Sequence, residues 1–319
     1  MVFSIILLYI RVNSYWRVFM VAKVILNPYS ARWRAKERFP EAELALKKSG
    51  VDFEVAVSEK KGHSVELAEQ AVKDGFSPII AAGGDGTIGD VVHGMAKAVP
   101  EGEALPPFGV IPLGTANDLM ANLKVSTNLD EVAKTIAAGK TRLMDLCKVN
   151  DRYFVNNTAI GLEPVVTVIQ EEISWLKGIP RYLYAAVAAI YQGTSWQAEL
   201  KWDDGEYTGP ISLVSIGNGA CTGGLFYVTP HADLFDGKLT FTFGYVQSRL
   251  RMLGLLPLTM KAGAGNFVEK DEIHEINTTH LSIKLTESSP SHADGEIFNR
   301  ELYEAKYQIF PARLPILMP

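Results

Sequence analysis

Apolar positions in the first half of the chain follow two alternating periods. Short apolar runs, typical of strands buried in a parallel sheet, occupy 22–26, 79–82 and 108–111, and residues 51–57 predict a further strand. Between and after them, apolar residues at helical spacing predict helices over 32–48, 64–73 and 130–138. This alternation predicts a doubly wound, Rossmann-like α/β domain over residues 20–145.

The rhythm changes after Asp145. Short strand patterns now follow one another, at 146–149, 153–156, 198–202, 211–216, 239–243, 281–285 and 306–310. Turns at Asn150-Asp151 and Asp204-Gly205 predict two hairpins, 146–149 with 153–156 and 198–202 with 211–216. The pattern predicts an antiparallel β domain, a sandwich or a barrel, over 146–311, with residues 312–319 as a tail that packs back on the first domain.

Two apolar helical segments interrupt these strands, near 173–191 and 249–262. Packing in the core is one interpretation of both segments. The other is that they line a cleft for acyl chains, since ligand pockets are mostly apolar.

The first residues of the sequence are apolar, but the run from Val2 to Ile10 is too short to cross a bilayer. No basic segment precedes this run and no small-residue cleavage site follows it, which argues against a signal peptide. We expect residues 1–19 to be an upstream extension or a weak surface anchor.

Composition limits the class of protein. The chain has 319 residues, of which 47% are hydrophobic and 21% charged, as in ordinary globular proteins. A formal net charge of −5 argues against binding of nucleic acid through a basic surface. Cys147 and Cys221 belong to no metal or disulfide motif. We therefore expect a cytoplasmic protein.

A turn of glycines, one carboxylate and one hydroxyl follows the apolar run at 79–82. Its sequence is Gly83-Gly84-Asp85-Gly86-Thr87. Glycines let backbone N–H groups approach a phosphate, and the helix that follows adds free amides and a positive dipole end. Because Asp85 would repel a bare phosphate, a divalent cation, or a hydroxyl that loses its proton, should lie between them. The turn predicts a metal–nucleotide site; a plain helix cap by Asp85 is the alternative.

A second turn of the same kind, Gly114-Thr115-Ala116-Asn117-Asp118, follows the run at 108–111. Two such turns should lie at the carboxyl edge of one parallel sheet, where open α/β sheets bind ligands. Asn117-Asp118 is also an ordinary start of a helix, and that interpretation stays open.

Three sets of carboxylates in the second half are candidates for chemistry. Asp294-Gly295-Glu296 either returns to the cleft as a proton acceptor, with adjacent carboxylates raising each other's proton affinity, or forms a solvated turn. Asp233 and Asp236, next to Gly237, predict a cation site or a hairpin turn. Asp145, at the end of the first domain, either reaches the cleft or has a structural role.

The ordered set of motifs resembles the diacylglycerol kinase catalytic family, most of all its bacterial soluble lipid kinases, relatives of the sphingosine and ceramide kinases. The motifs are Asn27-Pro28-x-Ser30, Gly83-Gly84-Asp85-Gly86-Thr87, Gly114-Thr115-Ala116-Asn117-Asp118, Gly223-Gly224, Asp236-Gly237 and Asp294-Gly295-Glu296. The resemblance covers nearly all of the chain from Met20 onward. It implies an α/β nucleotide domain joined to a β-sandwich domain, with the active site between them.

The resemblance also implies roles for individual residues. Glu296 would be the proton acceptor, with Asp294 beside it, and Asp85 would act with a catalytic Mg²⁺. Asp236 would bind a structural Mg²⁺ through its carboxylate, with backbone oxygens near Asp233 and Lys238. The nucleotide would lie against Asn27, Pro28, Tyr29, Ser30, Ala31, Ser58, Gly83, Gly84, Asp85, Gly86, Thr87, Ile88, Gly89, Asp90, Thr115, Asn117 and Asp118.

Two positions depart from the family's pattern. Ala31 stands where a glycine is usual, and Gly89-Asp90 replaces the more common Asn-Glu pair. The second departure shortens the acidic side chain while keeping its charge.

The resemblance implies a kinase that uses ATP and Mg²⁺ to phosphorylate a lipid hydroxyl, with diacylglycerol converted to phosphatidic acid. A sphingoid base, ceramide or phosphatidylglycerol are alternative acceptors. NAD⁺ is another, because NAD kinases share the glycine turn, but the apolar segments 176–191 and 253–260 argue against it. A lipid-binding module without turnover is disfavoured by the intact Asp85 and Glu296. We expect peripheral, transient contact with a membrane surface, and a homodimer stays open.

Overall fold

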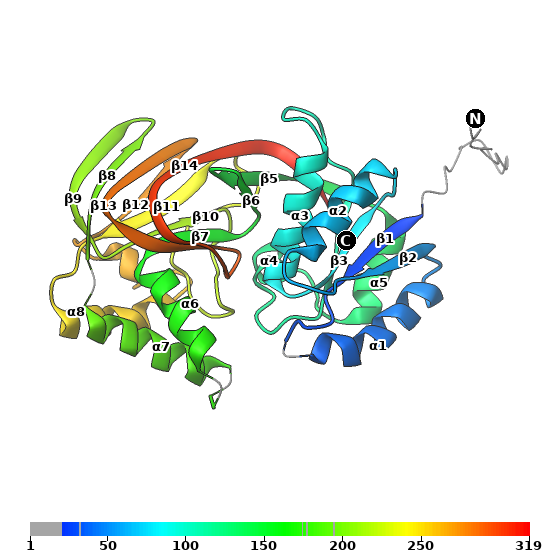
Figure 1. The fold of residues 1–319 in the computed structure, drawn as a ribbon, viewed down its shortest axis with the longest axis horizontal. Helices are drawn as coiled ribbons and strands as arrows, with labels where there is room; N and C mark the ends of the chain where they lie inside the picture. Colours follow the sequence, from blue (N-terminus) through cyan, green and yellow to red (C-terminus); the bar gives the residue numbers. More distant parts are fainter. Residues whose placement is uncertain (1–20, 32, 174, 177, 194) are drawn as a thin grey trace.

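The computed structural model describes residues 21–31, 33–173, 175–176, 178–193 and 195–319. The expected extension, residues 1–19, lies outside this part of the chain. Figure 1 shows a helix-rich domain and a strand-rich domain that lie next to one another and are joined by long strands.

The first domain is a parallel sheet with helices on both faces. Its strands run in the order β2-β1-β3-β4 and are β1 (Ala22–Leu26), β2 (Phe53–Val57), β3 (Ile79–Gly83) and β4 (Phe108–Pro112). Its helices are α1 (Arg34–Lys48), α2 (His63–Lys73), α3 (Asp85–Ala98), α4 (Asp118–Leu123) and α5 (Leu129–Ala138). α2 packs on α3, and α1 packs on α5. The predicted doubly wound fold is confirmed.

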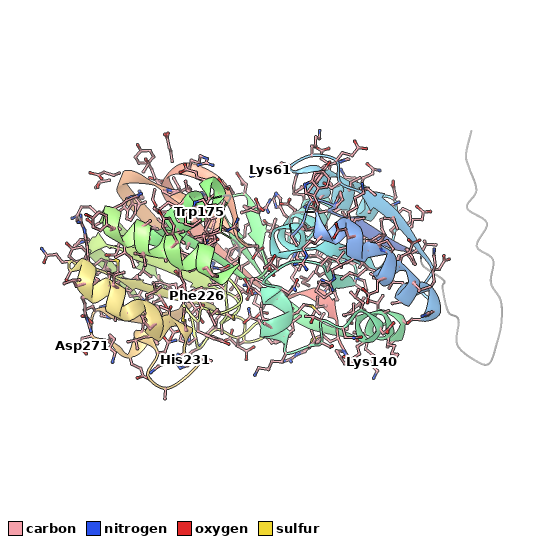
Figure 2. All side chains as sticks on the ribbon, turned by 90° about the horizontal axis from the view of Figure 1, so that it is seen from below. Lys61, Lys140, Trp175, Phe226, His231 and Asp271 are labelled. Carbon is pink, nitrogen blue, oxygen red and sulfur yellow. The ribbon has the colours of Figure 1, made fainter. Side chains whose placement is uncertain are left out.

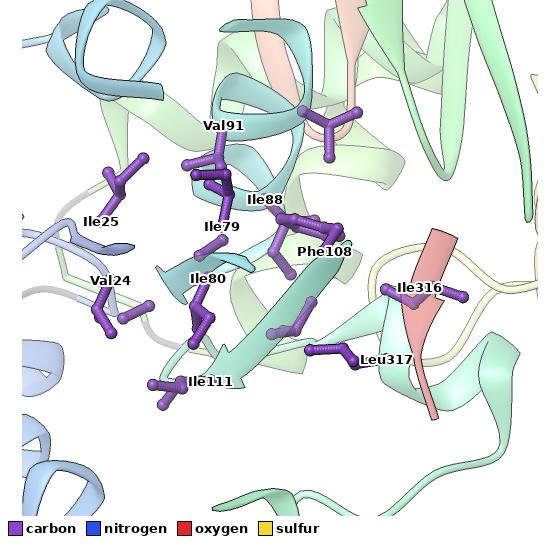
Figure 3. Close-up of a cluster of buried hydrophobic side chains, with 14 of the residues drawn as sticks. Val24, Ile25, Ile79, Ile80, Ile88, Val91, Phe108, Ile111, Ile316 and Leu317 are labelled. Carbon is purple, nitrogen blue, oxygen red and sulfur yellow. The ribbon is translucent and has the colours of Figure 1, made fainter. Parts of the chain in front are cut away.

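The core of this domain lies between the sheet and its helices. Ile79, Ile80 and Phe108 are fully buried, as continuous apolar strands of a doubly covered sheet should be. From α3, Ile88 and Val91 complete the cluster (Figure 3). This packing fixes β3 and β4 in parallel register, so the turns that follow them emerge side by side.

The second domain is antiparallel. Its strands are β6 (Arg152–Phe154), β7 (Asn157–Gly161), β8 (Trp196–Trp202), β9 (Gly205–Ile211), β10 (Leu213–Gly217), β11 (Leu239–Gly244), β12 (Ile273–Thr278) and β13 (His280–Ala293). The sheet order is β12-β11-β10-β7-β13, and β8 and β9 form a hairpin along β13. A second apolar core fills this β-sandwich.

Two long strands join the domains. β5 (Thr141–Val149) and β14 (Glu296–Leu317) pair with each other on both sides of the junction, and Ile316 pairs with Phe108 of β4. The described strands therefore form one continuous 14-stranded sheet. The last residues of β14, including Leu314 and Ile316, lie in the core of the first domain.

Asp145 lies at this junction and has a structural role. Its carboxylate accepts hydrogen bonds from the amides of Gly237 and Ala312, both at 2.7 Å, and its own amide donates to Leu234 O at 2.9 Å. Burial raises the pKa of Asp145, against the effect of these two amides. The carboxylate thus ties a loop of the second domain to the strand that returns to the first.

The expected helical segment at 173–191 is wrong in extent. The chain forms two helices, α6 (Leu162–Glu172) and α7 (Ile179–Gln192), which pack on each other. Gly178 has φ of 62° and Pro180 stands in the first turn of α7, so one helix cannot run through this point. The second segment is α8 (Arg249–Leu255) followed by a 3₁₀ helix (Leu256–Met260), since Pro257 cannot continue the α-helical hydrogen bonding; a further 3₁₀ turn is Phe267–Glu269.

The expected hairpin of 198–202 with 211–216 is also wrong. β8 pairs with β9, which starts at Gly205, and 213–217 is β10. Among the described strands β9 pairs with β8 alone, so it is an edge strand whose alternate side chains face water. Its polar sequence therefore lacks the apolar pattern of a strand. β7 and α6 lay outside the sequence prediction as well.

No described helix has the length and apolar composition needed to cross a membrane.

Candidate active site

The two glycine turns meet at one edge of the parallel sheet. An ideal Cβ on Gly114 would lie 2.5 Å from the Cα of Gly84, so neither turn tolerates a side chain here. This proximity confirms that the turns after β3 and β4 share the carboxyl edge. Asn117 has a left-handed backbone with φ of 53°, and its Oδ1 accepts from the amide of Gly114 at 3.1 Å. Its side chain thus shapes the second turn. Among the described contacts, the Asn117 side chain makes no capping hydrogen bond to α4.

The start of α3 is open toward this edge. Within the described chain no side chain caps α3, and Gly84 at its N-cap has an extended backbone. The first amides of a helix lack partners within the helix and carry its positive dipole end. These amides are therefore available to an anionic ligand.

The loop after β1 is tied to the same helix start. Thr87 Oγ1 lies 3.0 Å from both Asn27 Nδ2 and Ser30 Oγ, and Ser30 Oγ accepts from the amide of Gly84 at 3.4 Å. Thr87 is buried, so its hydroxyl links the two loops and faces no solvent. Pro28 is buried between them.

The backbone conformation of Ala31 explains why a glycine is usual at this position in the family. Its φ is 51°, a left-handed conformation that glycine adopts at little cost. Tyr29 next to it is 42% exposed and donates its hydroxyl to Glu59 O at 3.2 Å. Ser58, buried at the end of β2, donates to Lys60 O at 3.2 Å. The loops after β1 and β2 therefore lie together beside the glycine turns.

Glu296 lies against the first turn of α3. An ideal Cβ on Gly86 would lie 2.6 Å from Cγ of Glu296 and 2.9 Å from its Oε1. Only a glycine at this position admits the carboxylate. The structure thus brings Glu296, from the second domain, to the start of α3 in the first.

Two opposing effects act on the pKa of Glu296. Burial raises the pKa of Glu296, and Lys61, whose Nζ lies 3.6 Å from Oε2, opposes the shift. The side chain keeps 50% exposure, so its carboxylate remains accessible from the cleft side. A carboxylate with a raised pKa suits a general base.

Asp294 is anchored away from solvent. Its oxygens accept hydrogen bonds from three backbone amides, those of Val155 (3.1 Å), Asn156 (2.8 Å) and Asn157 (3.3 Å). Burial raises its pKa to about 6, against the effect of these amides. We predicted that Asp294 and Glu296 raise each other's pKa, but burial is the main cause at each, and the charges that next raise the pKa of Glu296 are those of Asp90 and Glu171. The contacts of Asp294 are those of a positioning residue for Glu296.

Asp118 joins the domains. Its carboxylate accepts from the amides of Gly223 and Gly224 in the second domain, at 2.7 and 2.6 Å. The carboxylate of Asp85, the first residue of α3, reaches the start of α4, where its Oδ1 accepts from Leu119 N at 3.4 Å. Burial, and next the charge of Asp85, raise the pKa of Asp118 to about 7, and burial raises that of Asp85. Two such carboxylates fit a site in which a cation neutralises them.

Three predicted nucleotide contacts on α3 face other parts of the protein. The Ile88 side chain is in the core under the sheet, because helical periodicity turns it inward. Gly89 faces Asp294, whose Cβ would be 3.0 Å from an added Cβ. Asp90 forms an ion pair with Arg152 at 2.6 Å. Thr115 is exposed, with its hydroxyl at the rim of the second turn.

The expected structural cation site is only partly built by side chains. Asp233 Oδ1 accepts from Phe235 N at 3.0 Å and Asp236 Oδ1 accepts from Lys238 N at 2.9 Å, so each carboxylate closes its own turn. In the part of the chain that the structure describes, no group of three metal-binding side chains occurs. One carboxylate with carbonyls and water still fits a hard cation such as Mg²⁺.

Sequence reasoning missed two contributors to this site. Lys61 sits in an exposed turn, and no local pattern relates it to Glu296. Gly86 and Gly89 were taken as neighbours of phosphate, whereas both admit side chains of the other domain. Two glycines three residues apart lie on the same face of a helix and leave that face without side chains. This spacing was the available signal that another part of the chain packs there.

Comparison with known proteins agrees with this geometry. Residues 21–149 match the model of the diacylglycerol kinase catalytic domain. Residues 156–318 match that of the YegS C-terminal NAD kinase beta sandwich-like domain. The chain belongs to the diacylglycerol kinase family. It is therefore a kinase, a phosphotransferase of the lipid-kinase type.

Named relatives are bacterial. The chain is 28% identical to the diacylglycerol kinase of Staphylococcus carnosus, over 86% of this chain and 88% of that protein. It is 32% identical to that of Staphylococcus aureus (strain bovine RF122 / ET3-1), over 69% of each. A crystal structure of a diacylglycerol kinase from Bacillus anthracis superposes with a TM-score of 0.70 at 19% identity, covering 94% of this chain and 97% of that one. At this identity the superposition shows the fold alone.

We predict that Gly86→Ala lowers kinase activity about 10²-fold without lowering stability. An added Cβ displaces Glu296, and misplacement by about 1 Å can cost this much. Alanine is otherwise favoured in a helix by about 1 kcal/mol. Initial rates and thermal melts measure the two effects. Gly254→Ala in α8, with no atom within 4 Å, is the control; equal activity of both variants would contradict the prediction.

Proposed function

We propose that the protein transfers the γ-phosphate of ATP to the hydroxyl of a lipid, most directly diacylglycerol, with Mg²⁺ as the metal. The close packing of Glu296 on Gly86 carries this proposal. It brings the carboxylate of Glu296, the proposed proton acceptor, against the first turn of α3, whose free amides we propose to bind phosphate. Relatives named diacylglycerol kinase support this choice of acceptor.

The chemistry follows from the residues of this chain. Amides at the start of α3 bind phosphate oxygens, and the loop of Asn27 and Ser30 holds that helix start in place. Glu296 accepts the proton of the lipid hydroxyl as the new O–P bond forms. Asp294 keeps Glu296 in position, and Asp118 keeps the second domain closed on the first.

Mg²⁺ neutralises the transferring phosphate when bound. Asp85, half-buried beside Asp118, is the residue proposed to contact the catalytic ion or its water. The raised pKa of Asp118 reflects burial and the uncompensated charge of Asp85. Asp236, with backbone oxygens near Asp233 and Lys238, is proposed for the structural ion.

An apolar cluster next to the Asp118 contact supports a lipid acceptor over NAD⁺. Tyr182 of α7 stacks on Phe226 with ring centroids 4.2 Å apart, next to Gly223 and so next to the Asp118 contact. α6 and α7 form an apolar cluster behind this pair. We propose that acyl chains lie near this cluster, because its composition suits them better than a dinucleotide.

The direct test uses purified protein, labelled ATP, Mg²⁺ and mixed micelles of each candidate lipid. We expect labelled phosphatidic acid from diacylglycerol, and a loss of about 10²–10⁴-fold for Glu296→Gln, since general-base catalysis contributes this much. If another lipid is labelled instead, that lipid and not diacylglycerol is the acceptor. NADP⁺ formation from NAD⁺, without label in any lipid, would refute the proposal.

The pH profile should depend on Lys61. A base works only when deprotonated, so activity should rise with pH through the raised pKa of Glu296. Lys61→Met removes the cation that opposes this shift, so the pKa rises further and the acidic limb of kcat moves to higher pH. Lys60→Met, which removes a neighbouring exposed cation paired with Glu66, is the control. Because Lys61 is 77% exposed, high salt should shrink the difference; a limb that stays in place at low salt would speak against Glu296 as the base.

Membrane contact is proposed through an exposed apolar face of the helical layer, the α7 face. It comprises Trp175, Tyr184, Val187, Tyr191 and Leu250, which are 69%, 50%, 46%, 76% and 82% exposed. Three of them follow helical spacing on α7. Trp175 packs edge-on against Tyr184, and the Arg249 guanidinium lies 5.5 Å from the Tyr191 ring, so the face is continuous to α8. Figure 2 shows Trp175 at the surface of this domain.

Exposed aromatic side chains and arginine suit a bilayer surface with anionic lipids. We predict that the triple variant of Trp175, Tyr191 and Leu250 to alanine binds anionic vesicles more weakly and has a higher KM for vesicle lipid. The KM for ATP and activity on a soluble short-chain diacylglycerol should stay unchanged. Vesicle flotation measures binding. Tyr303→Ala, at a 53% exposed tyrosine of β14, is the control, and equal binding by both variants would exclude the α7 face.

A further inference from the structure

A buried carboxylate outside the glycine turns connects the second domain to the Glu296 hairpin. The side chain of Glu163, in the first turn of α6, is 12% exposed. It receives hydrogen bonds from three strands, through Ser215 Oγ (2.6 Å) of β10, Asn157 Nδ2 (3.0 Å) of β7 and His292 Nε2 (3.1 Å) of β13. A buried carboxylate so supplied holds its partners tightly.

His292 is the first link to the hairpin. It lies two residues before Asp294 on β13, opposite Ile297 of β14 and Ala159 of β7. Its side chain is 3% exposed, and Nδ1 has no hydrogen-bond partner among the described residues. The contact to Glu163 is therefore the one side-chain hydrogen bond that this ring makes in the described chain.

Asn157 is the second link. Its side chain donates to Glu163, and its backbone forms two hydrogen bonds with Asp294: Asp294 N donates to Asn157 O at 2.8 Å, and Asn157 N donates to Asp294 Oδ1 at 3.3 Å. Glu163 thus reaches the hairpin through β13, which leads into it, and through β7, which pairs with β13.

The hairpin needs such support. Asp294 and Gly295 both have positive φ, 49° and 81°, and a left-handed conformation is unfavourable for a residue with a side chain. Burial raises the pKa of Glu163, but the hydrogen bonds from His292, Ser215 and Asn157 outweigh it and hold the pKa below its ordinary value. Glu163 is therefore charged at neutral pH, as a strong acceptor must be.

We propose that Glu163 is a positioning residue, which fixes the Asp294-Gly295-Glu296 hairpin on α3 through His292 and Asn157. Its effect on catalysis rests on the proposed lipid kinase function; its effect on the hairpin does not. Loss of these contacts lets Glu296 shift from its place on Gly86 while the nucleotide side of the cleft stays intact.

The test uses two variants with different packing demands, Glu163→Gln and His292→Leu. Backbone amides 155–157 and 294 should exchange with solvent about tenfold faster in both, because a hydrogen bond to a charged group is lost. kcat should fall about 10²-fold with the KM for ATP unchanged. His292→Gln, whose amide can donate from near the place of Nε2, should restore most of both.

Glu275→Gln is the matched control. Glu275 on β12 has the same 12% side-chain exposure and also pairs with a histidine, His231 at 2.6 Å, but lies far along the sheet from the hairpin. Wild-type exchange and kcat in Glu163→Gln and His292→Leu would overturn the proposal, as would equal changes in Glu275→Gln. If the wild-type protein phosphorylates no lipid, the proposed function fails, and the exchange rates still decide the role of Glu163.

Discussion

The close approach of the Asp294–Glu296 hairpin to α3 is the contact on which this structure depends. A carboxylate from one domain lies against the first turn of a helix in the other. Gly86 and Gly89 allow it, since any side chain there would occupy the space of Glu296 or Asp294. The continuous sheet and two buried carboxylates hold the two domains in the positions that this contact requires.

The continuous sheet supplies the register. β14 leaves the hairpin at Glu296, crosses the β-sandwich and ends in the core of the nucleotide domain beside β4. The strand that starts at Glu296, the proposed proton acceptor, therefore ends in the sheet whose turns we propose to bind phosphate. Asp145 and Asp118, each accepting two backbone amides across the junction, limit rotation between the domains.

Charge is distributed unevenly across the cleft. Asp85, Asp118 and Asp294 are near enough to influence one another's ionisation, and Lys61 alone among the described cations contacts Glu296. Under the proposed function, a cation that enters with the nucleotide would neutralise this cluster of carboxylates. The amides of Val155, Asn156 and Asn157 compensate Asp294 locally, which leaves Asp85 and Asp118 as the pair that a metal would serve.

The sequence by itself determined the doubly wound domain, the two phosphate-type turns and the family, because these depend on local periodicity and on residues adjacent in the chain. Only the tertiary structure decided which face of α3 meets the hairpin, that Ile88 is buried in the core, that Asp90 pairs with Arg152, and that Lys61 contacts Glu296 and Glu163 contacts His292. Lys61 and Glu296, and Glu163 and His292, are more than a hundred positions apart, and Asp90 and Arg152 are 62 apart, so no local pattern records these contacts. The pairing of β9 was not predicted for a related reason. An edge strand with polar side chains can be identified only when its neighbouring strand is known.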